Sequence, residues 1–140
     1  MNATICDFNV GPMVRSTLRL LIGLVGLLAL GVSIRLWTAP AKVGAILGLA
    51  SEGLAGMATL RADVAGFFAG VGLFSFLAAL RGDRILVVPL TLVGLALAGR
   101  LLSAVLLGLP PQQYASVAIE VALVVLFLAG RRAFADADRI

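Results

Sequence analysis

The sequence predicts an all-α membrane protein in a single domain over residues 1–140, with a bundle of four transmembrane helices and an amphipathic interfacial helix between the first and second spans. Hydrophobic residues make up 61% of the chain, and charged residues make up 13%, against about 25% in ordinary soluble domains. The mean hydropathy is +1.13. This composition excludes a water-soluble globular domain and a disordered chain.

Four segments are long and apolar enough to cross a bilayer, which takes about 20 residues in a helix. We predict spans at approximately 17–37, 61–80, 85–107 and 112–130. Strands are disfavoured because the chain lacks period-two alternation and an open sheet edge cannot be satisfied in lipid. A short polar hairpin at 81–84 separates the second and third spans, and Gly108, followed by two prolines, ends the third span.

The segment between the first two spans is too long for a turn. Its apolar residues recur at helical spacing and predict an amphipathic helix that lies in the membrane interface or folds back onto the bundle: Val43, Ile46, Leu47, Ala50, Leu54 and Met57. Four glycines in the same segment weaken a helix, so a broken helix or a plain loop stays open as the alternative: Gly44, Gly48, Gly53 and Gly56.

Basic residues predict the orientation of the spans. With four crossings, seven arginines fall on one side of the membrane: Arg15, Arg19, Arg81, Arg84, Arg131, Arg132 and Arg139. The positive-inside rule then places both termini in the cytoplasm, and Trp37 and Tyr114 at the opposite interface. The net charge of +4 is scattered over the ends of apolar runs, so it does not indicate a nucleic-acid partner.

Small residues in the first two spans are placed for close contact between helices. The first span has Gly23, Gly26, Ala29 and Ser33 along one stripe, and the second has Gly66 and Gly70 four residues apart. In lipid, close approach of two backbones gains dispersion contact where no hydrophobic force joins the helices. We expect these stripes to pack inside the chain or, alternatively, against a second copy or a larger membrane complex.

Four ionisable residues fall inside the predicted spans: Arg61, Asp63, Arg100 and Glu120. A charge within the hydrocarbon costs at least ~2.5–3.5 kcal/mol on insertion scales, so it is normally paired or lines a cavity. The Cα levels of Arg100 and Glu120 differ by about 9 Å at 1.5 Å per residue, and their side chains lean toward each other because side chains tilt toward the N-terminus of a helix. We therefore predict an Arg100–Glu120 pair, and Asp63 is a candidate for a third member.

The residue types present argue against an enzyme. The chain has no histidine and one cysteine, which excludes imidazole bases, histidine metal ligands and an internal disulfide. The carboxylates within the spans are not clustered, so few catalytic groups remain. We expect no catalytic residue, no metal site and no cofactor.

Several of these residues occur together in a pattern that resembles a known family: Arg61-Ala62-Asp63 followed by Gly66 and Phe67-Phe68, then Gly99 to Ser103, Gly108-x-Pro110 and Glu120. The pattern resembles domain of unknown function 4345, a family of small bacterial membrane proteins, over residues 60–130. The resemblance implies a four-helix protein of a bacterial inner membrane and marks Arg61, Asp63, Arg100 and Glu120 as family-type positions. The chain departs from the family in having Ala65-Gly66 where Gly-Gly is more common.

Two functions stay open from the sequence. The first is a non-enzymatic accessory or scaffold subunit that associates with itself or with a larger inner-membrane complex. The alternative is a binder or carrier of a lipid or small anionic ligand at the polar cluster, which would then open toward the outer leaflet. An Arg100–Glu120 pair that only fixes the register of two helices is a third interpretation of the same residues.

Overall fold

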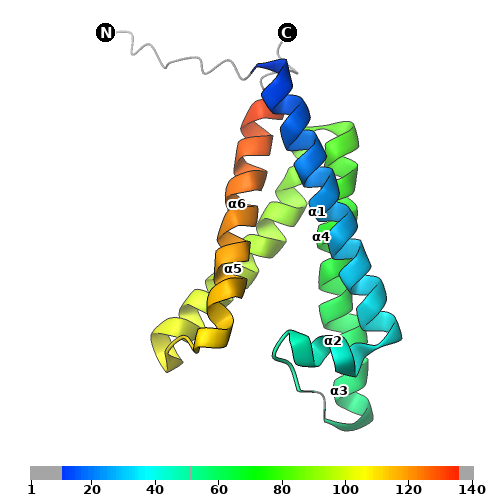
Figure 1. The fold of residues 1–140 in the computed structure, drawn as a ribbon. Coiled ribbons are helices and arrows are strands. Elements are labelled where there is room, and N and C mark those ends of the chain that lie inside the picture. The colour runs from blue at the N-terminus through cyan, green and yellow to red at the C-terminus, as the bar shows by residue number, and fades with distance from the viewer. Residues whose placement is uncertain (1–10, 51, 136–140) are drawn as a thin grey trace.

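The computed structural model describes residues 11–50 and 52–135, and every regular element in this part of the chain is helical (Figure 1). Four helical stretches are long and apolar enough to cross a membrane: Pro12–Thr38, Gly53–Arg81, Arg84–Leu107 and Pro111–Ala135. The predicted all-α fold with four such helices is therefore confirmed, and it indicates a multi-pass membrane protein. Arg139, one of the arginines used to predict orientation, lies outside the described residues.

Helix α1 (Pro12–Thr38) contains the first predicted span and starts five residues before it. Pro12 stands at the first helical positions, where its fixed φ favours a helix start and its missing N–H costs little. Only one charged residue, Arg15, lies in the added stretch, and nothing there breaks the helix. The helix ends just before Pro40, which cannot continue the hydrogen-bond ladder.

The prediction of one amphipathic helix between the first two spans is wrong, and the alternative of a broken helix is confirmed. The structure has two short helices instead, α2 (Pro40–Ile46) and α3 (Gly53–Thr59). Gly48 and Gly53 take φ values of +76° and +60°, which an α-helix does not contain and which cost other residues free energy. These two glycines divide the apolar pattern, so its first half forms α2 and its second half joins the next crossing.

The second crossing is one continuous helical rod made of α3, η1 (Leu60–Val64) and α4 (Ala65–Arg81). It therefore begins at Gly53, eight residues before the predicted start at Arg61. The stretch η1 is a π-helix, in which amides bond five residues back rather than four. Such a stretch adds one residue to a turn and shifts the side chains that follow around the helix axis.

The remaining elements follow the predicted order. Gly82, at φ +117°, makes the turn from α4 into η2 (Asp83–Leu86), which continues into α5 (Val87–Leu107). Gly108, at φ +78°, ends α5 as predicted. The short η3 (Pro111–Gln113) then leads into α6 (Tyr114–Ala135), which runs five residues past the predicted end of the fourth span.

The helices form two pairs that meet at one end of the molecule (Figure 1). Helices α1 and α4 lie side by side along their length, while α5 and α6 form a second antiparallel hairpin. We call the end near the chain termini the termini end, and the end with α2, α3 and the α5–α6 connection the loop end. The pairs diverge toward the loop end. The buried core gathers toward the termini end, and its members are Ile22, Val71, Ala78, Leu86, Val93, Phe127, Ala133 and Phe134.

The α1–α4 contact depends on two glycines that face each other. A Cβ on Gly26 would lie 2.7 Å from the backbone N of Phe76 and 2.9 Å from the carbonyl oxygen of Gly72. A Cβ on Gly72 would lie 2.8 Å from the carbonyl oxygen of Gly26. All three distances are shorter than side-chain contacts allow, so the two backbones approach as closely as glycine permits. Gly23 faces Ala79 nearby, at 3.5 Å from the Cβ position.

The predicted stripes of small residues take part in this packing unequally. Ala29 packs against the core, and Ser33 is buried and donates a hydrogen bond from Oγ to the carbonyl oxygen of Ala65 at 2.8 Å. In the second span Gly70 contacts Leu92 of α5, whereas Gly66 has no atom within 4 Å of its Cβ position and is exposed. Gly66 therefore does not mediate packing inside the chain, and the glycine of α4 that meets α1 is Gly72 instead.

Candidate functional site

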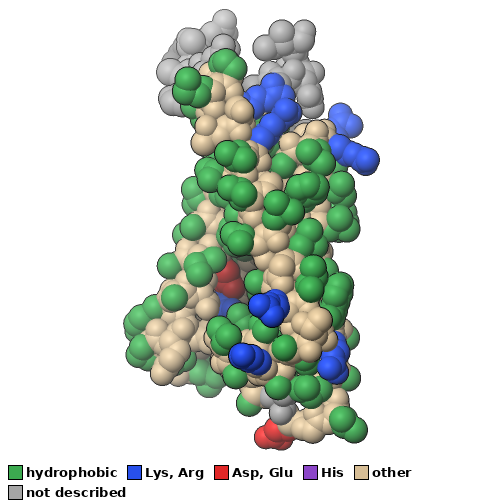
Figure 2. Space-filling model, turned by 45° about the vertical axis from the view of Figure 1, so that its right-hand side comes forward, with side chains coloured by type: hydrophobic (Ala, Val, Ile, Leu, Met, Phe, Trp, Pro, Cys, Tyr) green, Lys and Arg blue, Asp and Glu red, His purple; other side chains and the backbone are tan. Residues whose placement is uncertain are grey.

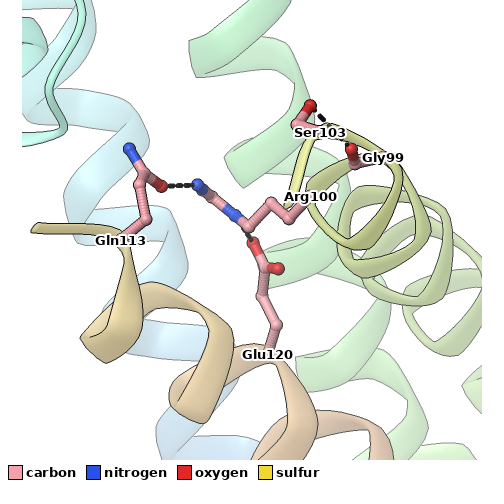
Figure 3. A network of polar contacts seen from close by, with 5 residues as sticks. All are labelled: Gly99, Arg100, Ser103, Gln113 and Glu120. Carbon is pink, nitrogen blue, oxygen red and sulfur yellow. Dashed lines mark hydrogen bonds and ion pairs between the residues drawn. The ribbon is translucent and has the colours of Figure 1, made fainter. Parts of the chain in front are cut away.

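The predicted pair of opposite charges forms between α5 and α6. The Nε of Arg100 donates to the Oε1 of Glu120 at 2.6 Å (Figure 3). The side chain of Arg100 is 35% exposed and that of Glu120 is 14% exposed. Arg100 lies in the second half of α5 and Glu120 in the first half of α6, so the antiparallel hairpin brings both toward the loop end.

Gln113 is a third member of this cluster that the sequence analysis did not identify. Its Oε1 accepts a hydrogen bond from the Nη1 of Arg100, so the guanidinium lies between the amide and the carboxylate (Figure 3). The Nε2 of Gln113 lies 3.6 Å from the Cβ position of Gly48, beside the turn that follows α2. A signal was present in the sequence, because Gln112 and Gln113 follow two prolines directly before an apolar run.

Only one of the two carboxylate oxygens of Glu120 accepts a hydrogen bond from the described residues. Its Oε2 is buried and has no hydrogen-bond partner in the described part of the chain. An unpaired buried acceptor costs free energy, and the ion pair with Arg100 offsets part of that cost. The carboxylate therefore holds Arg100 from one side while its second oxygen stays sealed in the protein.

An open cavity of about 940 Å³ lies along the face of α5 that carries Arg100. Its lining is mostly apolar and closes at the α5–α6 connection: Ala96, Gly99, Arg100, Ser103, Leu107, Gly108, Leu109, Pro110 and Gln113. Figure 2 shows the molecule hollowed between its two lobes, with an acidic and a basic side chain inside the hollow. A cavity of a few hundred to about 1,000 Å³ with few polar groups is typical of a small-molecule site.

Two side-chain nitrogens on the cavity wall are donors without a partner in the described part of the chain. Of the guanidinium nitrogens of Arg100, Nε and Nη1 are bonded, and Nη2 has no hydrogen-bond partner among residues 11–50 and 52–135. The Nε2 of Gln113 likewise has none in this range. The hydroxyl of Ser103 donates to the carbonyl oxygen of Gly99 at 2.9 Å, so its proton is engaged within the helix.

Arg61 and Asp63 do not join this cluster, so the predicted third member is wrong. Residues two positions apart on a helix do not face the same neighbour, and here the two diverge. The Nε of Arg61 donates to the carbonyl oxygen of Trp37 at 3.2 Å. Asp63 is exposed and makes no hydrogen bond or ion pair with the described residues.

Trp37 and η1 form a second polar contact at the loop end. The amide of Ala65 donates to the carbonyl oxygens of Leu60 and Ala62, whereas an α-helix would pair it with the carbonyl of Arg61. The indole Nε1 of Trp37 donates to that carbonyl oxygen of Arg61 at 3.0 Å. The π-helical stretch therefore frees a backbone acceptor that the tryptophan of α1 satisfies.

The described residues hold no group of three or more His, Cys, Asp or Glu side chains that could bind a metal ion. The cluster has one carboxylate, one guanidinium and one amide, and the carboxylate is already paired. Such groups can bind and orient a polar headgroup through hydrogen bonds, with an apolar wall beside them.

Comparison of the chain with protein-family models, with curated proteins and with solved structures finds no match. The resemblance to domain of unknown function 4345 therefore stays a hypothesis. Any statement about function depends on the geometry of the chain itself.

Proposed function

We propose that this protein is a small multi-pass membrane protein that binds a molecule with an apolar chain and a polar headgroup in the cavity beside Arg100. One observation carries the proposal: an arginine held by Glu120 and Gln113 faces an open, mostly apolar cavity of about 940 Å³. An ionisable residue within a span is by default a mark of function. A carrier or a storage site for such a molecule would use the same geometry, and no catalysed reaction is part of the proposal.

The basic residues indicate how the four spans are oriented in the membrane. We place both termini in the cytoplasm by the positive-inside rule, and we place the chain in a bacterial inner membrane because the family resemblance implies it. Six described arginines support this orientation because they lie toward the termini end: Arg15, Arg19, Arg81, Arg84, Arg131 and Arg132. In this orientation the cavity, which is lined by the α5–α6 connection, belongs to the outer leaflet.

The test fills the cavity and measures binding of two defined probes. Methyl palmitate carries a neutral ester, and hexadecyl methyl phosphate carries a permanent negative charge on a chain of similar length. Binding to the purified protein in mild detergent is measured by native mass spectrometry over a range of probe concentrations. We expect at least one probe to bind the wild-type chain at one site.

A matched pair of variants locates that site. Gly99 lines the cavity, and Gly94 lies on the same helix outside the lining. Neither has an atom within 4 Å of its Cβ position, so a side chain enters open space at both. We expect Gly99→Leu to weaken binding by at least about tenfold, and Gly94→Leu to leave it unchanged. If neither probe binds, or if both variants behave alike, the proposed function is wrong.

A second candidate is an accessory subunit that associates with itself or with another membrane protein. A specific observation favours it: Gly66 and Ala62 lie exposed on the outer face of the second crossing, and Gly66 has no neighbour within 4 Å of its Cβ position. Exposed small residues allow another helix to approach closely in lipid. Native mass spectrometry tests this too, because Gly66→Leu should abolish an assembly that Gly31→Leu, on the equally open face of α1, leaves intact.

A further inference from the structure

The charge on the cavity wall is already balanced. Arg100 contributes the cation, and Glu120 holds its Nε at 2.6 Å, so the pair has no net charge. An anion that entered the cavity would leave one uncompensated negative charge in surroundings of low dielectric constant. Burying such a charge costs desolvation free energy, and its attraction to a neutral ion pair offsets only part of that cost. The balance therefore favours a neutral ligand over an anionic one.

The hydrogen-bonding groups on the wall complement a ligand that accepts. The Nη2 of Arg100 and the Nε2 of Gln113 are donors without partners in the described part of the chain. The unpaired oxygen of Glu120 is buried, and Glu120 is not among the residues that line the cavity. The lining thus presents two unpaired nitrogen donors, while the carboxylate of Glu120, on a side chain that is 14% exposed, is engaged by Arg100. A carbonyl oxygen with two lone pairs matches this arrangement.

The rest of the wall suits a hydrocarbon chain. Ala96, Gly99, Leu107, Leu109 and Pro110 surround the polar groups and offer no charged side chain. A molecule with an apolar chain can bury it along these residues while its head lies at Arg100. The polar groups would therefore bind the headgroup, and the apolar wall would contact the hydrocarbon chain.

We propose that the cavity selects a lipid-chain molecule whose head is a neutral carbonyl group, such as an ester, an amide or a quinone, and that it discriminates against phosphate or carboxylate heads. This inference rests on the proposed function, because it names the ligand class of the same cavity. Arg100 and Gln113 donate to the carbonyl oxygen, and Glu120 sets the charge preference from behind the guanidinium.

The test compares three probes on the wild-type protein by native mass spectrometry: methyl palmitate, hexadecyl methyl phosphate and hexadecane. We expect methyl palmitate to bind at least about tenfold more tightly than each of the other two. Equal or tighter binding of the phosphate probe overturns the inference and leaves the proposed function standing. Equal binding of hexadecane overturns the inference as well, because the head is then not recognised. If no probe binds, both the function and the inference fall.

A charge variant then tests the physical cause. Glu120→Gln replaces the carboxylate by an amide of similar size and removes its negative charge, so the cavity carries the uncompensated charge of Arg100. We expect the preference to invert, with hexadecyl methyl phosphate binding more tightly than methyl palmitate. An unchanged preference in folded Glu120→Gln protein overturns the role given to Glu120. If this variant does not fold, the wild-type comparison of the three probes decides.

Discussion

Adding one methyl group to Gly26 should destabilise the α1–α4 pair. A Cβ at this position would lie 2.7 Å from the N of Phe76, 2.9 Å from the O of Gly72 and 3.1 Å from the Cα of Phe76. All three are backbone atoms, which cannot rotate away as the end of a long side chain can. The methyl group of Gly26→Ala therefore forces the two helices apart.

The size of the effect follows from these distances. Non-bonded carbon contacts are most favourable at about 3.5–4.0 Å, so the backbones must separate by roughly 0.5–1 Å, and such a gap forfeits a quarter to a half of each contact energy. Overpacking of this kind costs typically ~1–3 kcal/mol. Replacing glycine by alanine within a helix also gains up to about 1 kcal/mol of helix propensity, which must be subtracted.

Gly31→Ala is the matched control because Gly31 lies on the same helix and has no atom within 4 Å of its Cβ position. We expect Gly26→Ala to be less stable than Gly31→Ala by about 1–3 kcal/mol. The assay is unfolding by sodium dodecyl sulfate in a mild detergent, followed by the fluorescence of Trp37, the single tryptophan, which hydrogen-bonds across the same helix pair. Equal unfolding midpoints for the two alanine variants would refute the close approach of the backbones.

Three further predictions concern hydrogen bonds and charge, and all are measured by the same unfolding assay. Where Trp37 is replaced, far-ultraviolet circular dichroism takes the place of its fluorescence. Trp37→Phe should cost about 0.5–1.5 kcal/mol, because an exposed hydrogen bond to the carbonyl of Arg61 is lost; no loss would show that this carbonyl is satisfied otherwise. Ser33→Ala should cost ~0.5–1.5 kcal/mol, whereas Ser75→Ala should cost less, because the buried Oγ of Ser75 has no partner among the described residues; equal losses would contradict this. Arg100→Glu alone should cost stability at the lower end of ~3–5 kcal/mol, because the side chain of Arg100 is 35% exposed. Adding Glu120→Arg, which reverses the pair, should restore most of this loss. If the double variant does not recover stability, the pair is not an independent unit.

The sequence predicted the features that depend on composition and on one pair of charges. Four apolar runs are enough to locate four helices, and the direction in which side chains lean on antiparallel helices is enough to bring Arg100 to Glu120. Gly82 and Gly108 mark the ends of α4 and α5 because their positive φ values favour glycine. These are local properties, and each can be read from a few residues.

The features that the sequence did not predict depend on relative helix positions. Gly66 and Gly70 fit a common spacing for helix contact, yet Gly72 is the residue that meets α1. Ala65, Gly72 and Ala79 recur every seven residues and carry this contact, so the sequence contains a seven-residue period beside the four-residue spacing of Gly66 and Gly70. The π-helical stretch from Leu60 to Val64 has no such pattern, because it depends on a donor that α1 supplies.

The placement of the buried core has a mechanical consequence. The two helix pairs are joined at the termini end by the packing around Phe127 and Phe134, and this packing is the fulcrum about which one pair can rotate against the other. From Phe127 to Tyr114 the arm formed by α6 is roughly 20 Å long at 1.5 Å per residue, so a rotation of ~5° at the fulcrum displaces its tip by about 2 Å. Repacking a side chain near the termini would thus alter the separation of the two helix pairs at the loop end, which that side chain does not contact.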